Sequence, residues 1–392
     1  MLRSLKGLYH LLVAIVANIW FRFPSRDLTV IGITGTDGKT TTTTLIYEIL
    51  RQAGVKASSI TSVHATIAGR EYDTGFHVTT PSAWWVQKYL REAVDHGDTH
   101  MVLEVTSHAL SQSRVFGVQF EVGVITNVTH EHLDWHSTFE NYLRTKLTLL
   151  RQAKIAVVNR DEADLYVASL PYLSYKRYFT YGIRRDSMVN PITSVLRLKL
   201  PGEFNRYNAL AALAASEALG IDKRKAIKTL NNFSGIVGRM EVIQTKPFTV
   251  IVDFAHTPNA LMKALAAART MTKKRLIHVF GSAGLRDRTK RPLMGEASAA
   301  FADCIVLTEE DYRTEDVNRI IDAIMEGIPK GKEVYRETDR KTALMTAIGM
   351  AKPGDLVIVT GKGHEKSLCR GSREYPWSDQ KEIKKILRKV RV

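Results

Sequence analysis

Short apolar runs alternate with stretches of helical spacing along most of this chain. The run "TVIGIT" is followed by "TTTLIYEILRQAG", "HMVLEVT" by "HALSQSRV", and "VGVITNV" by "FENYLRTKLTLLRQA". This alternation is typical of a parallel sheet whose strands are joined by crossover helices. An alanine-rich segment, "FNRYNALAALAASEALGI", predicts a further helix that ends at Gly220.

A second series of strand-like runs begins at "FTVIVDF" and continues through "KRLIHVFGS", "ADCIVLT" and "GDLVIVTGKG". The two series meet in "FSGIVGRMEVI", so we place a domain boundary at about Gly238. A chain of 392 residues with 44% hydrophobic content can form two or three domains. We therefore predict an α/β protein with an apolar helix or anchor at 1–28, one domain at 29–238 and a second at 239–392.

The N-terminal segment at residues 7–21, "GLYHLLVAIVANIWF", is apolar nearly all round. Arg3 and Lys6 precede it, and Arg22 and Arg26 follow it. A spanning helix needs about 20 apolar residues, so this segment is too short for one. A secretory signal is disfavoured because no clear cleavage motif follows. Two interpretations remain open, a helix on a membrane surface and a helix docked on the protein.

The net charge of the chain indicates which classes of partner it can bind. Lys and Arg exceed Asp and Glu by 56 − 40, a net charge of +16, which favours anionic partners such as nucleotides, phosphorylated substrates, anionic lipid or nucleic acid. The basic residues are scattered and form no recognisable nucleic-acid module, so we expect no nucleic-acid partner. The two cysteines, Cys304 and Cys369, are too few for a disulfide framework or a four-thiolate zinc site. We predict a cytoplasmic protein.

The turn "GTDGKTTT", which follows the first strand, predicts a phosphate site. Gly35 and Gly38 allow close backbone approach, and the free amides of the helix start attract an anion. Lys39 can reach outer phosphates and the Thr40 hydroxyl can bind Mg²⁺. Only two residues separate the glycines, whereas the general P-loop pattern has four.

This turn resembles the ATP-binding turn of the Mur ligases, which more often carry Asn where this chain has Asp37. Further segments follow in the order expected of the MurE branch, and the resemblance covers about residues 29–392. These segments are "TTP", "EVTSHALSQSR", "TNVTHEHLDWH", "YLRTK", "FNRYNALAA", "GRME", "VDFAHTPNAL", "RDRTKRPLMGE" and "GKGHE". The resemblance implies a central P-loop-type ATPase domain with a mostly parallel sheet, followed by a Rossmann-like domain that binds an amino acid.

The resemblance also implies a reaction. Such ligases transfer the γ-phosphate of ATP to a carboxylate, and an amine then attacks the acyl phosphate. Negative charge accumulates during the transfer, so cations are needed, and the expected cofactors are ATP and two Mg²⁺ ions. The resemblance assigns the metal ligands to Thr40, Glu104, His132 and Lys146, the last as a carbamylated lysine. The positions implied to be catalytic are Lys39, Glu104, His132, Lys146 and Arg239.

Two of these assignments differ from what the residues alone predict. Lys146 in "YLRTKLTLL" is by itself typical of a solvated or snorkelling lysine. His130, His132 and His136 first indicate zinc, but no cysteine lies near them. We interpret His130 and His136 as structural or solvent-facing.

The remaining site residues are also implied by the resemblance. The nucleotide-binding positions are Gly35, Thr36, Asp37, Gly38, Lys39, Thr40, Thr41, Asn205, Asn208, Arg239, Asp253 and His256. The substrate-binding positions are Thr79, Thr80, Thr106, Gln112, Arg114, Arg286, Arg313, Gly361 and Glu365.

The amino-acid site departs from the family pattern. Enzymes that use meso-diaminopimelate usually show Asp-Asn-Pro-Arg, whereas Glu310, Asp311 and Tyr312 replace the first three residues here and Arg313 remains. The retained arginine can grip a carboxylate. Two extra acids favour a diamino substrate, so we predict diaminopimelate rather than lysine.

The resembled enzymes begin with a further domain that grips the UDP of the acceptor, and only residues 1–28 occupy that place here. We therefore expect a muramoyl-peptide acceptor that is UDP-linked or lipid-linked, a free amino acid, and a monomer that contacts the inner face of the membrane through residues 7–21 if the first interpretation of that helix holds. The predicted activity is that of an ATP-dependent, ADP-forming ligase in peptidoglycan precursor synthesis. The alternatives are a folylpolyglutamate or cyanophycin type ligase, against which "EVTSHAL" and "GKGHE" argue, and a nucleotide-switched nucleic-acid-binding protein.

Overall fold

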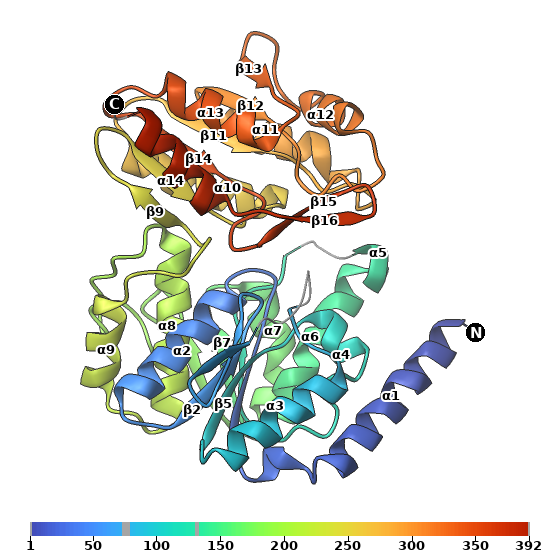
Figure 1. Ribbon diagram of the computed structural model, residues 1–392. Helices are drawn as coiled ribbons and strands as arrows, with labels where there is room; N and C mark the ends of the chain where they lie inside the picture. Colours follow the sequence, from blue (N-terminus) through green and yellow to red (C-terminus); the bar gives the residue numbers. More distant parts are fainter. Residues whose placement is uncertain (1, 73–78, 130–132, 391–392) are drawn as a thin grey trace. The chain divides into compact units, whose positions relative to one another are not determined.

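The computed structural model describes residues 2–72, 79–129 and 133–390, and it divides into two compact units. The first unit comprises residues 1–199 and 204–234, and the second comprises residues 200–203 and 235–392. Figure 1 labels their helices and strands. Each unit is described here by itself.

The first unit is built on a mostly parallel sheet with the strand order β4-β3-β2-β5-β1-β6-β7-β8. β3 pairs antiparallel with β2 and β4, and the other neighbours are parallel. The strands are β1 Thr29–Thr34, β2 Ala57–Ile60, β3 Ala65–Ile67, β4 Arg70–Tyr72, β5 His100–Glu104, β6 Phe120–Ile125, β7 Ile155–Asn159 and β8 Arg177–Tyr181.

Helices connect and cover these strands, as the alternating pattern predicts. They are α1 Leu2–Trp20, η1 Pro24–Arg26, α2 Lys39–Gln52, α3 Ala83–Asp95, α4 Ser107–Ser111, α5 Leu133–His136, α6 Phe139–Gln152, α7 Ala163–Leu173, α8 Glu203–Ala218 and α9 Lys223–Asn232. The expected helix over "HALSQSRV" is shorter than its pattern, because Ser113 adopts a left-handed conformation with φ 54° just beyond α4. α8 ends before Gly220, whose φ is 75°.

The centre of this sheet is buried on both faces. Val30 and Leu103 pack with Val86 and Leu90 of α3, and Leu149 of α6 belongs to the same core cluster. The alternate residues of β1, such as Ile31, are equally buried. Continuous apolar strands of this kind are typical of parallel sheets covered by helices on both sides.

The apolar N-terminal segment forms α1, which is docked on the protein along one face and exposed along another. Ala14 and Ala17 are fully buried and α1 contacts α3, so one face of the helix is docked on the first unit. Leu8, Leu12 and Ile19 are more than half exposed on the helix. None of the helices among the described residues combines the length and apolarity needed to cross a membrane.

The second unit contains another mostly parallel sheet, in the order β13-β12-β11-β14-β10-β9, of which β9 is antiparallel to β10. Its strands are β9 Glu241–Gln244, β10 Thr249–Val252, β11 Leu276–Phe280, β12 Cys304–Leu307, β13 Glu333–Arg336 and β14 Leu356–Val359, with a separate hairpin of β15 Ser367–Arg370 and β16 Arg373–Pro376. Its helices are α10 Pro258–Met271, α11 Lys290–Phe301, α12 Val317–Met325, α13 Arg340–Met350 and α14 Asp379–Val390. The predicted α/β class with mostly parallel sheets is confirmed in both units.

Candidate active site

The turn between β1 and α2 has a backbone that only glycine fits at two positions. Gly35 has φ 148° and Gly38 has φ 81°. A Cβ atom on Gly35 would lie 1.8 Å from Thr126 Oγ1, and one on Gly38 would lie 2.1 Å from Asn208 Oδ1. The close approach of these neighbours, added to the left-handed backbone, explains both glycines.

The segment after β6 holds this turn in place. The Asp37 amide donates to Asn127 Oδ1 at 2.9 Å, and the Thr126 hydroxyl donates to the Asp37 carbonyl at 2.7 Å. The Lys39 ammonium donates to the carbonyls of Gly35 and Thr36 at 3.0 and 2.7 Å, so its charge lies against the turn. A cation and the amino end of α2 together favour a bound anion.

Asn205 and Asn208 lie beside the same turn. Both belong to the first turns of α8 and both are buried. Asn208 Nδ2 donates to Asn205 Oδ1 at 3.1 Å, and the Asn208 side chain faces Gly38. This placement is compatible with nucleotide contact, and the adenine contact itself stays a prediction.

Three hard oxygen donors converge at the start of α2. The Thr40 hydroxyl donates to Glu104 Oε1 at 3.1 Å and lies 2.8 Å from Ser62 Oγ, while the Ser62 amide donates to Glu104 Oε2 at 2.9 Å. Glu104 ends β5 and is 2% exposed. Because Mg²⁺ prefers oxygen ligands and needs only one or two carboxylates, this donor set fits Mg²⁺.

Lys146 is buried, so the interpretation as a solvated or snorkelling lysine is wrong. Its side chain is 1% exposed, and Nζ donates to the Gly35 carbonyl at 2.6 Å and lies 4.5 Å from the ring centroid of Tyr142. The local pattern misled because α6 turns this residue toward the nucleotide turn instead of toward solvent. The Lys146 ammonium therefore lies against the turn between β1 and α2, and its role as a carbamylated metal ligand stays a prediction.

The histidine cluster is described only in part. His130 and His132 lie outside the described residues, so the proposed second metal ligand stays a prediction. His136 is buried, with its ring centroid 5.1 Å from that of Tyr142 and 5.9 Å from that of His108. It packs as an aromatic side chain, in agreement with a structural role. Among the described residues, no three His, Cys, Asp or Glu side chains form a metal-binding group.

Four of the expected acceptor residues form one hydrogen-bonded cluster. The Thr106 amide donates to Thr80 Oγ1 at 3.1 Å, and the Thr106 hydroxyl in turn caps α4. Arg114 donates from Nη1 to the Thr80 carbonyl at 2.7 Å and from Nε to Gln112 Oε1 at 2.9 Å. Thr79 is half-buried next to Thr80. A held guanidinium with hydroxyl neighbours suits a carboxylate ligand.

The second unit brings three of its expected nucleotide residues together around one aromatic ring. The Arg239 guanidinium lies 4.5 Å from the ring centroid of Phe254, and the His256 ring lies 4.7 Å from the same ring. Asp253 accepts from the Met240 amide at 2.7 Å, which ties "GRME" to "VDFAHTP". Burial, with a smaller effect from Lys290, lowers the pKa of His256 to about 4, so its imidazole is neutral at pH 7.

Gly363 and His364 of "GKGHE" adjoin this group. A Cβ atom on Gly238 would lie 2.2 Å from the backbone of each, and the ring centroids of His364 and Phe254 are 4.8 Å apart. "GRME" and "VDFAHTP", which are close in sequence, therefore meet "GKGHE", which lies about a hundred residues further along, within this unit.

The acidic residues expected at the amino-acid site of the second unit differ in their partners. Asp311 and Glu365 both pair with the buried Lys362, whose Nζ lies 2.8 and 2.5 Å from them. Glu310 is 7% exposed, its Oε2 has no hydrogen-bond partner among the described residues, and it faces Gly361, where a Cβ atom would lie 2.7 Å away. Two acids were expected to favour a diamino substrate. Only Glu310 is left to do so, because Asp311 is already paired with Lys362.

The two arginines of the second unit that were predicted for substrate binding differ in placement. Arg313 donates to the Gly284 carbonyl at 2.7 Å. Arg286 is exposed in the loop between β11 and α11.

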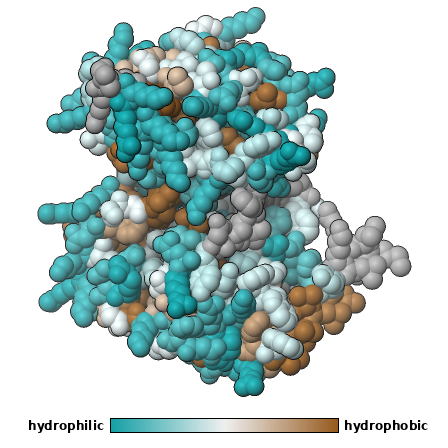
Figure 2. Space-filling model, viewed as in Figure 1, coloured by the Kyte–Doolittle hydropathy of each residue, from teal (hydrophilic) through white to brown (hydrophobic). Residues whose placement is uncertain are grey.

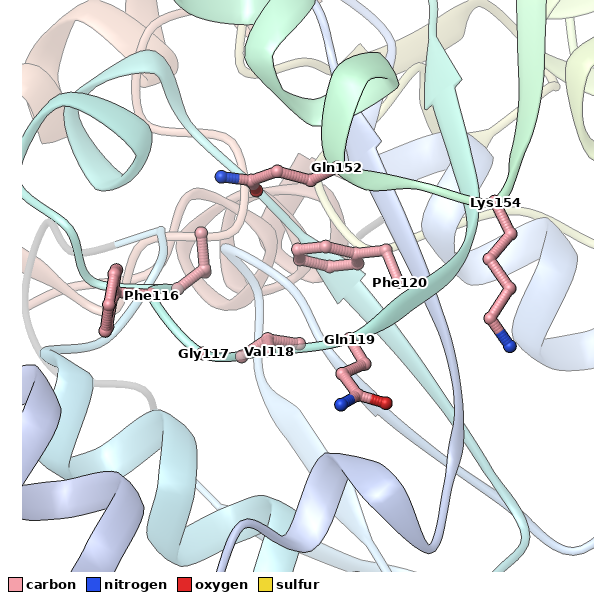
Figure 3. Close-up of a pocket in the computed structure, with 8 residues that line it drawn as sticks. Phe116, Gly117, Val118, Gln119, Phe120, Gln152 and Lys154 are labelled. Atoms are coloured by element: carbon pink, nitrogen blue, oxygen red, sulfur yellow. The ribbon is translucent and has the colours of Figure 1, made fainter. Parts of the chain in front are cut away.

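A surface pocket lies at the amino end of β6, and Val115 in its lining directly follows Arg114. It is lined by Val115, Phe116, Gly117, Val118, Gln119, Phe120, Gln152 and Lys154, and Figure 3 shows it in close-up. Phe120 begins β6, whereas Thr126 and Asn127 follow its end. Ligands of parallel α/β sheets bind at the carboxyl ends of the strands, so this pocket is not the nucleotide site.

Sequence reasoning missed three side chains that shape the site. Ser62 supplies an oxygen beside Thr40, Asn127 holds Asp37, and the Tyr142 hydroxyl lies 3.1 Å from Thr36 Oγ1. Asn127 and Tyr142 lie within or next to motifs already singled out, which is a usable signal. Ser62 stands in "TSVHAT", which carries no such pattern.

Comparisons with known proteins show which family this chain belongs to. The family model of the Mur ligase middle domain matches residues 33–216, and that of the Mur ligase glutamate ligase domain matches residues 238–363. The UDP-N-acetylmuramoyl-L-alanyl-D-glutamate--2,6-diaminopimelate ligase of Aquifex aeolicus (strain VF5) is 39% identical over 95% of this chain and 80% of its own length. The UDP-N-acetylmuramyl-tripeptide synthetase of Roseiflexus sp. (strain RS-1) is 38% identical over 96% of this chain and 81% of its own length.

A solved structure gives the same result. A UDP-N-acetylmuramoyl-L-alanyl-D-glutamate--2,6-diaminopimelate ligase matches with a TM-score of 0.65 and 30% identity, covering 93% of this chain and 79% of that one. These findings confirm the resemblance stated from the motifs. The chain belongs to the Mur ligase family, and its relatives include ligases of the MurE type.

Proposed function

We propose that this protein is an ATP-dependent ligase that joins a diamino acid to the carboxylate of a muramoyl peptide and releases ADP and phosphate. The observation that carries this proposal is the convergence of the nucleotide turn, Glu104 and the Arg114 cluster at the carboxyl ends of neighbouring parallel strands. The relatives named above carry names of this activity.

The residues of the first unit have separable roles in this proposal. Lys39 and the start of α2 would hold the phosphates, and Thr40 and Glu104 would hold Mg²⁺ together with His132 and a carbamylated Lys146. Bound Mg²⁺ would neutralise the charge that develops as the phosphoryl group moves to the acceptor. Arg114, with Thr80, Thr106 and Gln112, orients the acceptor, and this orientation lowers the entropic part of the barrier.

The second unit supplies the rest of the machinery. Arg239 would bind the γ-phosphate, and Asp253 and His256 would contact the nucleotide. The neutral imidazole of His256 can accept or donate a hydrogen bond without adding charge. Arg286, Arg313, Gly361 and Glu365 would bind the incoming amino acid.

We infer that the incoming amino acid is diaminopimelate. Glu310 supports this inference, because its buried carboxylate has an oxygen without a hydrogen-bond partner among the described residues and would be satisfied by an ammonium group. Arg313 can bind a carboxylate at the other end of the same molecule. A neutral amino acid would leave Glu310 uncompensated.

We also infer that the protein works as a monomer on the cytoplasmic side, with residues 7–21 touching the membrane. The acceptor would then be either a UDP-linked or a lipid-linked muramoyl peptide.

Product analysis tests the proposed function. The chain is incubated with ATP, Mg²⁺, UDP-muramoyl dipeptide and mixed amino acids, and products are identified by mass spectrometry. A new species with the mass of the acceptor plus diaminopimelate supports the proposal. Addition of L-alanine or D-glutamate refutes the diamino-acid pocket, and phosphate release stimulated by DNA or RNA instead of the acceptor refutes the ligase. A parallel reaction with the lipid-linked dipeptide identifies which acceptor is used.

A further inference from the structure

α1 has two unlike faces. Its docked face carries small or polar residues, since Ala14 and Ala17 are fully buried and Asn18 is 2% exposed. Its outward face carries the large apolar residues, with exposed fractions between 36% and 61%. This outward stripe is Leu8, Leu12, Ile15, Val16 and Ile19. The spacing i, i+4, i+7, i+8 and i+11 makes it one continuous face of the helix. Figure 2 shows hydrophobic surface along α1 at the lower right.

Hydrogen bonds fix which face points outward. Asn18 Nδ2 donates to the Phe116 carbonyl and to the Ala14 carbonyl, both at 2.8 Å. A Cβ atom on Gly117 would lie 2.4 Å from Asn18 Oδ1, so the Asn18 side chain packs directly against the Gly117 backbone. The outward stripe is therefore exposed because the other face is occupied. A soluble protein rarely exposes a contiguous apolar surface of this kind without a partner.

The carboxyl end of α1 is anchored by aromatic rings. The Trp84 ring of α3 lies 5.9 Å from Trp20 and 5.1 Å from Phe21, measured between ring centroids. Trp20 nevertheless remains 69% exposed. Tryptophan at the end of an apolar helix is typical of the boundary between lipid and water.

The charge around the stripe has one sign. Residues 1–26 contain no Asp or Glu. Arg22 and Arg26 directly follow α1 and both are exposed. Basic residues next to an apolar helix face are attracted to the anionic headgroups of a bilayer.

We propose that the outward stripe of α1, with Trp20, Arg22 and Arg26, docks on a bilayer that contains anionic lipid, with the helix lying in the plane of the interface. Spanning is ruled out for α1 by its docked face, which α3 and residues 116–117 already cover. This proposal rests on the proposed function in one respect. It takes the membrane contact of residues 7–21 and specifies which face of the helix makes it and which lipid it meets.

Docking would place the acceptor cluster close to the membrane. Asn18 holds Phe116 and Gly117, which follow Arg114 by two and three residues. The docked helix and the acceptor cluster are therefore parts of the same unit, separated by a short, hydrogen-bonded segment. A ligase held in this way meets an acceptor at the bilayer surface without a further adaptor.

Vesicle flotation with the full chain tests this proposal. We expect the protein to float with vesicles of phosphatidylcholine containing about a third phosphatidylglycerol, and to float less with phosphatidylcholine alone or at high salt. The variant Ile15→Glu/Ile19→Glu should bind anionic vesicles at least about tenfold more weakly, because two charges would enter the apolar interface. Val167→Glu/Leu170→Glu is the matched control, since it places two charges on exposed apolar positions of α7.

The outcomes of these experiments either support or overturn membrane docking. Equal flotation of the full chain and Ile15→Glu/Ile19→Glu overturns the proposal, as does failure of the full chain to bind anionic vesicles. A dimer in sedimentation that only the α1 variant dissociates, without vesicle binding, assigns the stripe to a second copy and also overturns it. Ligation of a water-soluble acceptor should be unchanged in this variant, so loss of vesicle binding and loss of ligase function are told apart. Circular dichroism confirms that both variants are folded.

Discussion

The Thr80 hydroxyl donates a hydrogen bond to the main-chain carbonyl of Glu104 at 2.9 Å. The Glu104 carboxylate, on the same residue, accepts from Thr40 in the nucleotide turn. One residue at the end of β5 thus joins the acceptor cluster to the proposed metal site. In the proposed function, this link would bring the acceptor carboxylate close to the nucleotide phosphates.

Replacing Glu104 by Gln should lower kcat/KM on the order of 10²-fold or more, because the shape of the side chain is kept while the metal-binding charge is lost. Phosphate release that depends on acceptor and amino acid, measured against Mg²⁺ concentration, checks this. Glu121→Gln is the control, since Glu121 lies at the amino end of β6, away from the carboxyl ends of the strands, where it pairs with Lys154. Full activity of Glu104→Gln at the same Mg²⁺ concentration would remove Glu104 from the metal site.

Gly38→Ala should abolish tight ATP binding. The substitution adds left-handed backbone strain of about 1–2 kcal/mol and a contact 2.1 Å from Asn208 Oδ1. Gly54→Ala carries the same kind of strain, with φ 86°, but its Cβ atom would meet nothing within 4 Å. Gly54→Ala should therefore lose stability and keep its ATP affinity. Calorimetric titration measures the ATP affinity of each variant. Equal affinity in the two variants would contradict the assignment of this turn to nucleotide binding.

Lys146→Ala should be inactive, and millimolar short carboxylates should restore part of the activity by supplying the missing anion. The buried Nζ beside Gly35 leaves room for such a ligand only when the side chain is removed. Lys154→Ala, an exposed lysine, should be active with or without carboxylate. A carbamate signal in ¹³C NMR after equilibration with labelled CO₂ gives a readout apart from activity. If Lys146→Ala is inactive and carboxylates do not restore activity, the proposed role of Lys146 as a metal ligand is wrong.

Glu310 should make the stability of the second unit depend on pH. Burial raises the pKa of its carboxyl from the ordinary value of 4.5 to about 7. Between these values the unfolded chain has lost the proton that the folded protein still holds, so the free energy of unfolding falls as pH rises. Above pH 7 both states are ionised, and the loss levels off at about 3 kcal/mol.

The variant Glu310→Gln should lack this component, so its stability relative to the unmodified protein should increase between pH 5 and pH 7. Urea unfolding at several pH values checks the sign. Glu296→Gln, an exposed position of α11, should show no such change. A pH profile that Glu310→Gln leaves unaltered would show that the carboxyl titrates normally.

The order of strands and helices was predictable because it rests on local periodicity. "TVIGIT" and "FENYLRTKLTLLRQA" have unambiguous spacing, and β1 and α6 form where these patterns stand. The short α4 was overestimated, since the left-handed conformation of Ser113 leaves no trace in apolar spacing. The faces of α1 were also beyond reach, because an all-apolar segment does not say which side meets the protein.

The site was predictable only where its parts are contiguous. The nucleotide turn is one segment, so its glycines, Lys39 and Thr40 could be interpreted directly. Arg114 meets Thr80 across 34 residues, and only the resemblance placed them in one site. Asp311 forms an ion pair with Lys362, 51 residues away, which composition alone could not reveal.

The most direct test is a crystal structure with a non-hydrolysable ATP analogue and Mn²⁺ in place of Mg²⁺, using anomalous scattering to locate the metal. The account predicts two metal peaks at about 2.0–2.2 Å from their ligands, one at Thr40 and Glu104 and one at His132 and a carbamylated Lys146. Metal bound elsewhere, with these four side chains free of it, would contradict the proposed mechanism.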